Sequence, residues 1–334
     1  MNYIKNGNWV RYQNGNYFVS INLDNGTKIR ETINPNATEF VADFPESADV
    51  KITNRCTNPL GYTNLTDEEI KCGKGNCNFC HEGSGPCGKH SDALHSHVWN
   101  TFSPYTELAL GGGNVLEYPD LISLLERLKT LHLIPNITVH ETHFMENLPL
   151  LHKLADEKLI YGLGISMNDV NKEGFIEAVK EFPNAVLHVI NGIVGIEQLK
   201  KLANNNLKIL ILGYKDVRRG KILRSIPMMR VENEKKQKEL YDALPEIITQ
   251  KWFDVVSFDN LAIKQLNPKG RFVSDEDWET IYMGDDGLDG EQTSASMYID
   301  LVENEFARNS CDVDHRMPVG NMSVKEMYKI LCKM

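Results

Sequence analysis

The chain has 334 residues, a length that permits about two domains or a single α/β barrel. Hydrophobic residues make up 41% and charged residues 25%, which excludes disordered and collagen-like chains, and the net charge of −10 argues against nucleic-acid binding. No apolar run reaches the roughly 18–20 residues that span a bilayer, and the first residues lack the apolar segment of a signal peptide. We therefore expect a cytoplasmic protein with no membrane partner.

Residues 1–46 are predicted to form a β-meander appended to the main domain. Runs of alternating apolar and polar residues at 9–13 and 17–21 flank an Asn-Gly turn. A second turn, Asp-Asn-Gly, leads into a third run at 27–30. Such turns between alternating runs are strong signals of β-hairpins.

Residues 47–268 alternate short apolar runs with helical stretches. The predicted strands are 48–53, 107–110, 136–140, 161–165, 185–189, 208–212 and 255–258. Regular alternation of buried strands with helices indicates a parallel α/β fold. Because no Gly-x-Gly-x-x-Gly turn follows a strand, we predict a partial (β/α)6-type TIM-like barrel rather than a Rossmann sheet.

Residues 269–334 are less regular and are predicted to form a C-terminal extension that packs on the core. Residues 297–306 read as a terminal helix. The acidic segment 284–290 is interpreted as a turn rather than a Ca²⁺ loop, because its spacing does not match an EF-hand.

In such a barrel the active site lies at the carboxyl ends of the strands. Polar residues or glycines follow the predicted strands at these ends. They are Gly111, Gly112, Gly113, Asn114, His140, Glu141, His143, Ser166, Asn191, Gly213, Tyr214, Lys215 and Asp259. We expect the site among them.

The seven cysteines suggest metal or redox chemistry rather than disulfides, since five of them cluster between positions 56 and 87. Cys77 and Cys80 form a Cys-x-x-Cys pair that can bind one metal centre, and a third thiolate comes from Cys72 or Cys56. Three thiolates on a 4Fe–4S cluster leave one iron open to a small molecule. The alternative is a zinc ion closed by all four thiolates, in a zinc-stapled α/β barrel that acts as a hydrolase or binding module without redox chemistry. The position after the first barrel strand, at the predicted mouth, favours the cluster.

At these motifs the chain resembles the radical S-adenosylmethionine (SAM) superfamily, in particular its small members common in phages and prophages. The resemblance covers about residues 48–305. It is carried by Ile-Thr-Asn-x-Cys at 52–56, Cys-x-Phe-Cys-His-Glu at 77–82, Gly-Lys-His at 88–90, Glu-Leu-Ala-x-Gly-Gly-Gly-Asn at 107–114, His-Val-Ile-Asn-Gly at 188–192, Ile-Leu-Ile-Leu-Gly-Tyr-Lys at 209–215, Ser-Phe-Asp-Asn at 257–260 and Met-Gly-Asp-Asp-Gly at 283–287.

Two features depart from the pattern of that superfamily. Its usual Cys-x3-Cys-x2-Cys spacing is here Cys-x4-Cys-x2-Cys if Cys72 is counted, while Cys56 holds the usual strand-end position but is separated from Cys77 by twenty residues. We favour Cys72 as third ligand because a shorter loop costs less closure entropy, with Cys56 as the alternative. The superfamily's common Gly-Gly-Glu is here Gly-Gly-Asn, ending at Asn114.

The resemblance implies a reaction and a set of roles. It implies that a 4Fe–4S cluster reductively cleaves SAM to a 5′-deoxyadenosyl radical, which abstracts hydrogen from an unidentified substrate, with electrons from an external one-electron reductant such as flavodoxin or ferredoxin. The implied cluster ligands are Cys72, Cys77 and Cys80, with Cys56 as the alternative. The implied SAM-binding residues are Phe79, Gly111, Gly112, Gly113, Asn114, Ser166, Asn191, Gly213 and Tyr214. Candidate catalytic residues, as substrate contacts or proton donors, are His140, Glu141 and Lys215.

Overall fold

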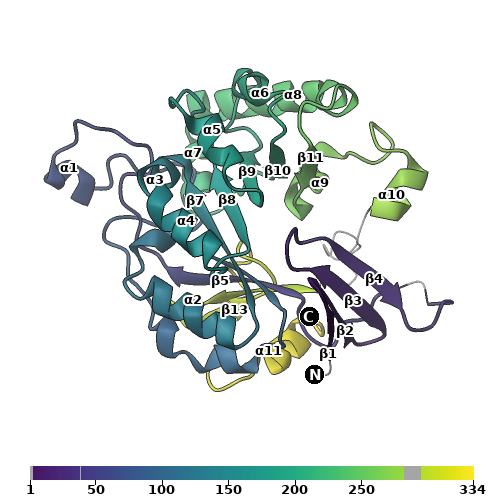
Figure 1. Ribbon diagram of the computed structural model, residues 1–334. Helices are drawn as coiled ribbons and strands as arrows, with labels where there is room; N and C mark the ends of the chain where they lie inside the picture. Colours follow the sequence, from purple (N-terminus) through teal and green to yellow (C-terminus); the bar gives the residue numbers. More distant parts are fainter. Residues whose placement is uncertain (1–2, 38, 282–294) are drawn as a thin grey trace.

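The computed structural model describes residues 3–37, 39–281 and 295–334 of the chain (Figure 1). Within these residues a ten-stranded sheet has the order β11-β10-β9-β8-β7-β6-β5-β12-β13-β14. All neighbours from β11 to β12 pair in parallel, whereas β13 and β14 are antiparallel. The sheet is curved, and helices lie along its outer side (Figure 1).

The parallel strands β5 to β11 follow each other in chain order, so each helical connection runs back to the amino end of the next strand. Their bounds are Ser47–Thr53 (β5), Glu107–Gly112 (β6), Ile134–His140 (β7), Gly162–Ser166 (β8), Ala185–Ile190 (β9), Lys208–Leu212 (β10) and Val255–Phe258 (β11). Each coincides with a strand predicted from the sequence. The order leaves β11 and β14 at the two edges, which is consistent with a partial rather than a closed barrel.

The helices cover the outer side through apolar stripes. Their bounds are Asp67–Lys71 (α1), Leu121–Thr130 (α2), Glu141–Glu146 (α3), Leu148–Asp156 (α4), Phe175–Lys180 (α5), Ile196–Leu202 (α6), Arg219–Ser225 (α7), Pro227–Thr249 (α8), Asn260–Leu266 (α9), Asp275–Ile281 (α10) and Val324–Leu331 (α11). In α2 the buried residues Leu121, Leu124, Leu125 and Leu128 recur at helical spacing. No helix in the described ranges combines the length and apolarity that a membrane crossing requires.

A separate four-stranded antiparallel sheet precedes the main one. Its strands are Tyr3–Asn6 (β1), Trp9–Asn14 (β2), Tyr17–Asn22 (β3) and Lys28–Thr32 (β4), paired in chain order, which is consistent with the predicted meander. The first strand was not expected from the sequence. Val10, Val19 and Ile21 of this sheet are buried against Tyr105 and Ile134, which lie at the amino ends of the main strands. The small sheet therefore shares a hydrophobic cluster with the amino ends of the main strands.

A buried carboxylate, Glu46, ties the small sheet to the main one. It accepts hydrogen bonds from Arg30 at 2.8 and 3.0 Å and from the Tyr17 hydroxyl, and it lies 3.4 Å from Lys28. Lys28 also pairs with Glu107 at the start of β6. Because Glu46 directly precedes β5, these contacts fix the small sheet at the amino ends of β5 and β6.

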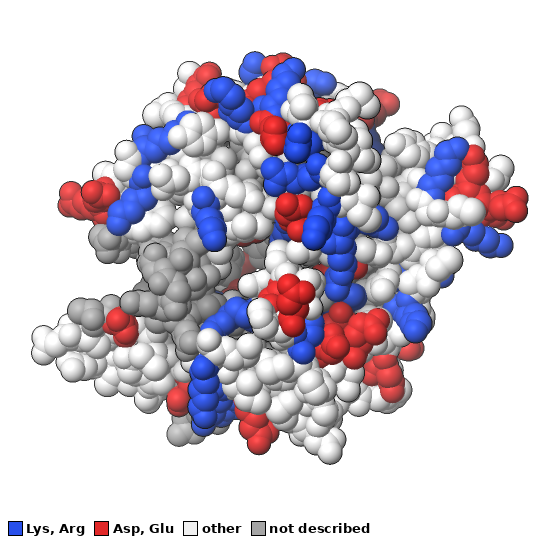
Figure 2. Space-filling view, turned by 180° about the vertical axis from the view of Figure 1, so that it is seen from behind, with Lys and Arg blue, Asp and Glu red and all other residues white. Residues whose placement is uncertain are grey.

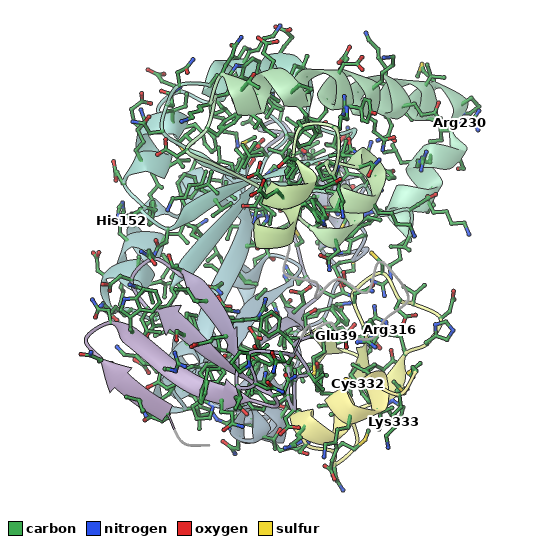
Figure 3. The ribbon with its side chains drawn as sticks, turned by 90° about the vertical axis from the view of Figure 1, so that its right-hand side faces the viewer. Glu39, His152, Arg230, Arg316, Cys332 and Lys333 are labelled. Atoms are coloured by element: carbon green, nitrogen blue, oxygen red, sulfur yellow. The ribbon has the colours of Figure 1, made fainter. Side chains whose placement is uncertain are left out.

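The C-terminal segment corrects one expectation. Residues 297–306 are not a helix: they contain β12 (Ser296–Asp300) and β13 (Glu305–Ala307), followed by β14 (Met317–Pro318). The periodicity of a short apolar run cannot distinguish a strand from a buried helix. Here the segment forms a strand because β12 pairs in parallel with the free edge of β5. The acidic segment 284–290 lies outside the described residues. Figure 3 shows the C-terminal segment, with Cys332 and Lys333, at the end of the molecule opposite α8, which carries Arg230.

Candidate functional site

A cavity of about 720 Å³ lies within the curve of the sheet and reaches the carboxyl ends of its strands. This volume is in the range of small-molecule binding sites. Barrel interiors are normally filled by large branched side chains, but here the inward positions of β6 and β8 hold Ala109, Gly162 and Gly164. The small residues therefore leave the interior hollow.

Three thiols, those of Cys56, Cys77 and Cys80, line this cavity together with Phe79. Burial, followed by the neighbouring Cys80, raises the pKa of the Cys56 thiol to about 12. Burial, followed by Cys80 and then Cys56, also raises the pKa of Cys77. All three thiols thus belong to the wall of one cavity.

Cys72, the thiol favoured from the sequence, is exposed and does not line the cavity. It is the residue at which α1 ends, and this helix has a capping box formed by Thr66 and Glu69. The helix projects from the body of the molecule (Figure 1). Cys56 instead stays beside the sheet, because its amide donates to the Gly85 carbonyl at 3.0 Å. The loop between Cys56 and Cys77 thus carries Cys72 outward and leaves Cys56 in the same cavity wall as Cys77 and Cys80.

The cavity lining includes three thiols, the ligand type that holds iron–sulfur clusters. Among the described residues, no three His, Cys, Asp or Glu side chains are gathered closely enough to hold one metal ion. Ligands that bind three different irons of a cluster lie farther apart than ligands that converge on one ion, and iron–sulfur clusters are held by thiolates. Arg219 also lines the cavity and opposes the rise in the pKa of both Cys56 and Cys77. Its charge would offset part of the negative charge of the two thiolates.

The glycine motif at the end of β6 lies directly against the segment that carries Cys56. Gly112 has a φ of +104°, and a Cβ there would overlap the Thr53 carbonyl oxygen. The amides of Gly113 and Asn114 donate to the carbonyls of Thr53 and Arg55, each at 2.8 Å. Glycine is therefore needed for this close backbone approach.

The residues of this motif that are predicted to contact SAM differ in whether they are available to a ligand. All four residues of 111–114 line the cavity, and a Cβ on Gly111 would have nothing within 4 Å. The Asn114 side chain is already engaged, since its oxygen accepts from the Leu116 amide at 3.2 Å. Gly111 is thus the open position of the motif, and Asn114 caps the following turn.

His140 faces the cavity as a neutral ring. Burial, followed by His143 and Lys172, lowers the pKa of His140 to about 3. Its Nδ1 accepts from the Thr142 amide at 3.2 Å. The Asn168 side-chain nitrogen lies 3.2 Å from Nε2, whereas its buried oxygen has no partner among the described residues. Turning this amide over lets Nε2–H donate to the oxygen, which fixes the tautomer.

Glu141, the next residue, points away from the cavity. It does not line it, and its carboxylate accepts from the backbone amides of Asn168 and Asp169, the latter at 2.9 Å. Burial raises the pKa of Glu141 to about 7. The carboxylate holds the loop after β8 in place rather than facing a reactant.

The remaining predicted residues divide in the same way. Ser166, Gly213, Tyr214 and Lys215 line the cavity. Asn191 does not: it is buried, and its side-chain nitrogen donates to Gln265 at 3.0 Å. Strand β9 instead turns its alternate residues toward the cavity, so its neighbour at position 190 lines the wall.

A buried ionic network below the thiols was not expected from the sequence. Glu82, two residues after Cys80, lies 3.2 Å from Lys51 and 3.3 Å from Arg218. Lys51 also pairs with Asp300 of β12 at 3.0 Å, and the Tyr298 hydroxyl donates to Glu82 at 3.2 Å. The sequence signal for this network was Lys51, a charged residue inside the otherwise apolar end of β5. Its partners could not be predicted because they are distant in the sequence.

Comparison with known proteins adds the fold. A crystal structure of Streptococcus suis SuiB bound to S-adenosylmethionine is similar, with a TM-score of 0.57 and 12% identity over 97% of this chain and 87% of that one. SuiB bound to its precursor peptide SuiA is similar, with a TM-score of 0.55 and 11% identity over 98% and 88%. No protein-family model and no curated protein sequence matches. The chain therefore has the mixed α/β fold of SuiB, with its large parallel sheet.

Proposed function

We propose that this chain is a radical SAM enzyme whose active site is the cavity at the strand ends. The observation that carries the proposal is the joint lining of that cavity by Cys56, Cys77, Cys80 and Gly111. A fold shared with a SAM-bound protein supports it.

Cys56, Cys77 and Cys80 are the proposed ligands of a 4Fe–4S cluster, and Cys72 is left outside. When bound, the cluster supplies the electron that cleaves SAM to a 5′-deoxyadenosyl radical, which abstracts hydrogen from the substrate. The cluster-binding thiols need a cation nearby, and Arg219 provides it. Its guanidinium is anchored by a hydrogen bond to the Ser84 carbonyl at 2.6 Å.

Residues of three strand ends, together with Phe79 of the cysteine-bearing loop, hold SAM in this proposal. Gly111 offers its exposed backbone to the amino group, and Phe79 packs on the adenine. Ser166, for which the structure gives no side-chain hydrogen bond to a described residue, is free to bond the ribose or the carboxylate. Tyr214 packs on the far side of the adenine, since its hydroxyl is tied to the Gly220 carbonyl at 2.7 Å.

The three candidate catalytic residues take different roles. His140 is uncharged at neutral pH, so it orients reactants by hydrogen bonding and does not serve as a cationic acid. Glu141 is a positioning residue for the loop after β8. Lys215 lines the cavity, where hydrogen bonds to His81 and Ser310 hold its ammonium in place, so it is a positioning residue.

The proposed partners are a one-electron reductant, such as flavodoxin or ferredoxin, and a substrate that enters the cavity, in a cytoplasmic setting. SuiB binds a peptide, and a peptide side chain is one kind of group that a cavity of about 720 Å³ accommodates. Positive and negative side chains are interspersed on the face seen in Figure 2.

Metal analysis and a SAM-cleavage assay test the proposal. The protein is reconstituted anaerobically and assayed for iron, sulfide and zinc, then reduced with dithionite in the presence of SAM. We expect about four irons per chain and formation of 5′-deoxyadenosine. Zinc without iron, and intact SAM, would refute the proposal and favour the zinc-stapled barrel.

A further inference from the structure

One ionisable side chain within the cavity has no role so far. Asp49 lies in the middle of β5, a strand flanked by parallel neighbours on both sides. Such strands are normally apolar, and burying a carboxylate without a partner is costly. Asp49 is nevertheless exposed, and it lines the cavity, so its side chain faces this inner space.

The Asp49 side chain makes no hydrogen bond or ion pair within the described part of the chain. Two positions along the same face of β5, Lys51 provides the contrast, since it is buried and pairs with both Glu82 and Asp300. Of the two charged residues on this face of β5, Lys51 is therefore paired within the protein, and Asp49 faces the cavity. A charge that folding leaves unpaired in a ligand-sized space is suited to a ligand of opposite charge.

The other charged groups near Asp49 are already engaged. Lys215 faces the same cavity but donates to His81 at 3.3 Å and to Ser310 at 3.0 Å. Asp259 accepts from the amides of Gly213 and Ala262 at 2.9 and 2.7 Å. Glu82 belongs to the buried ionic network already described. Burial raises the pKa of Asp49, and Lys215 opposes this rise.

Neutral polar groups complete the wall around Asp49. Side chains that line the cavity and make no hydrogen bond to a described residue are those of Asn136, Thr138, His188 and Ser257. Burial, followed by Lys215, lowers the pKa of His188 to about 4, so the ring is uncharged at neutral pH. Besides the engaged Lys215, the wall thus offers uncharged donors and acceptors to a group that binds at Asp49.

Asp49 lies deeper in the cavity than the proposed cluster ligands. It precedes Thr53, the last residue of β5, by four residues, which in a strand is about 13 Å. Cys56 lies beyond that strand end, whereas Gly111 of the glycine motif pairs with Lys51, two positions from Asp49. A group that reaches Asp49 therefore passes the strand ends and extends into the hollow interior, next to Ala109.

We propose that Asp49 binds a cationic nitrogen group, an ammonium or a guanidinium, at the inner end of the substrate cavity. That the bound molecule is a substrate rests on the proposed function. The cation site itself rests on the carboxylate that has no side-chain partner, its exposure to the cavity, the engagement of Lys215 by His81 and Ser310, and the uncharged polar groups of the same lining.

The test compares two probes of the same shape and different charge, n-butylguanidinium and n-butylurea. Their binding to the reconstituted, SAM-loaded protein is measured by isothermal titration calorimetry. The variants are Asp49→Asn, which removes only the charge, and Asp49→Glu, which keeps it. Asp156→Asn is the matched control, because Asp156 is an exposed aspartate at the end of α4 with no hydrogen bond or ion pair to a described residue.

A charge-assisted hydrogen bond contributes about 1.5–3 kcal/mol, which corresponds to about a tenfold or larger change in Kd. We expect n-butylguanidinium to bind wild type at least about tenfold more tightly than n-butylurea. Asp49→Asn should lose this preference, and Asp49→Glu and Asp156→Asn should keep it. Equal binding of the two probes to wild type, no binding of the cation, or an unchanged preference in Asp49→Asn would each overturn the inference.

The outcome is distinguishable from failure of the proposed function. Wild type that forms 5′-deoxyadenosine but shows no preference for the cation overturns only the role of Asp49. Wild type that prefers the cation but binds no iron and leaves SAM intact supports the cation site and overturns the radical SAM proposal.

Discussion

Substitution of Gly112 by alanine is expected to destabilise the whole protein, because the backbone at this position requires glycine. The φ of +104° is one that residues with a Cβ rarely adopt, and the new Cβ would overlap the Thr53 carbonyl oxygen. Thr53 ends β5, and Gly112 ends β6, so neither backbone can move without disturbing the pairing of two central strands.

The size of the effect follows from two contributions. A non-glycine residue at positive φ costs about 1–2 kcal/mol, and overpacking in a rigid interior costs about 1–3 kcal/mol. Together they predict a loss of about 2–5 kcal/mol in the free energy of unfolding. This is a large share of the roughly 5–15 kcal/mol that stabilises a typical domain.

Gly111→Ala is the matched control, because its Cβ would have nothing within 4 Å and would enter the cavity. Its free energy of unfolding should stay within about 1 kcal/mol of wild type, whereas SAM binding should weaken. Urea denaturation followed by circular dichroism measures stability, and equilibrium dialysis measures SAM binding. A loss below about 1 kcal/mol in Gly112→Ala would refute the backbone argument. Undiminished SAM binding in Gly111→Ala would refute the proposed contact.

Three further predictions concern buried ionisable groups. Because burial raises the pKa of Glu141 from 4.5 to about 7, the folded state holds a proton that the unfolded state releases, and wild type should lose about 3 kcal/mol relative to Glu141→Gln as the pH rises through this window. His188 acts in the opposite direction, since its lowered pKa of about 4 means that stability relative to His188→Gln should fall as the pH drops from about 6.5 to 4. Urea denaturation across this pH range checks both, and parallel curves for variant and wild type would contradict the pKa assignments. Lys51→Met should cost about 3–5 kcal/mol, because it leaves two buried carboxylates, Glu82 and Asp300, without the lysine that pairs with both, whereas Lys153→Met on the exposed side of α4 should change stability by less than about 0.5 kcal/mol.

Local patterns were sufficient to predict most of the main sheet. The strands from 47–53 to 255–258 are apolar runs separated by amphipathic helices, so the residues of each run are sufficient to predict a strand. The pairing of β12 with β5 is not, because it joins segments about 250 residues apart in the chain. The run 297–306 was therefore wrongly predicted as a helix.

The candidate site shows the same division between local and distant information. The glycine motif and the Cys77–Cys80 pair are local signals, and both line the cavity. Loop-closure entropy favoured Cys72 over Cys56, but this cost grows only slowly with loop length. A capped helix in the inserted loop outweighs it by carrying Cys72 outward. Glu141 and Asn191 were expected at the site from their positions at strand ends, yet hydrogen bonds to other loops and helices direct their side chains elsewhere.

The central claim is that Cys56, rather than Cys72, joins Cys77 and Cys80 in holding a catalytic cluster. The most direct measurement compares iron content and 5′-deoxyadenosine formation in anaerobically reconstituted wild type, Cys56→Ala and Cys72→Ala. We predict that Cys56→Ala forms no 5′-deoxyadenosine and retains less iron, whereas Cys72→Ala matches wild type in both. An active Cys56→Ala variant together with an inactive Cys72→Ala variant would contradict the account.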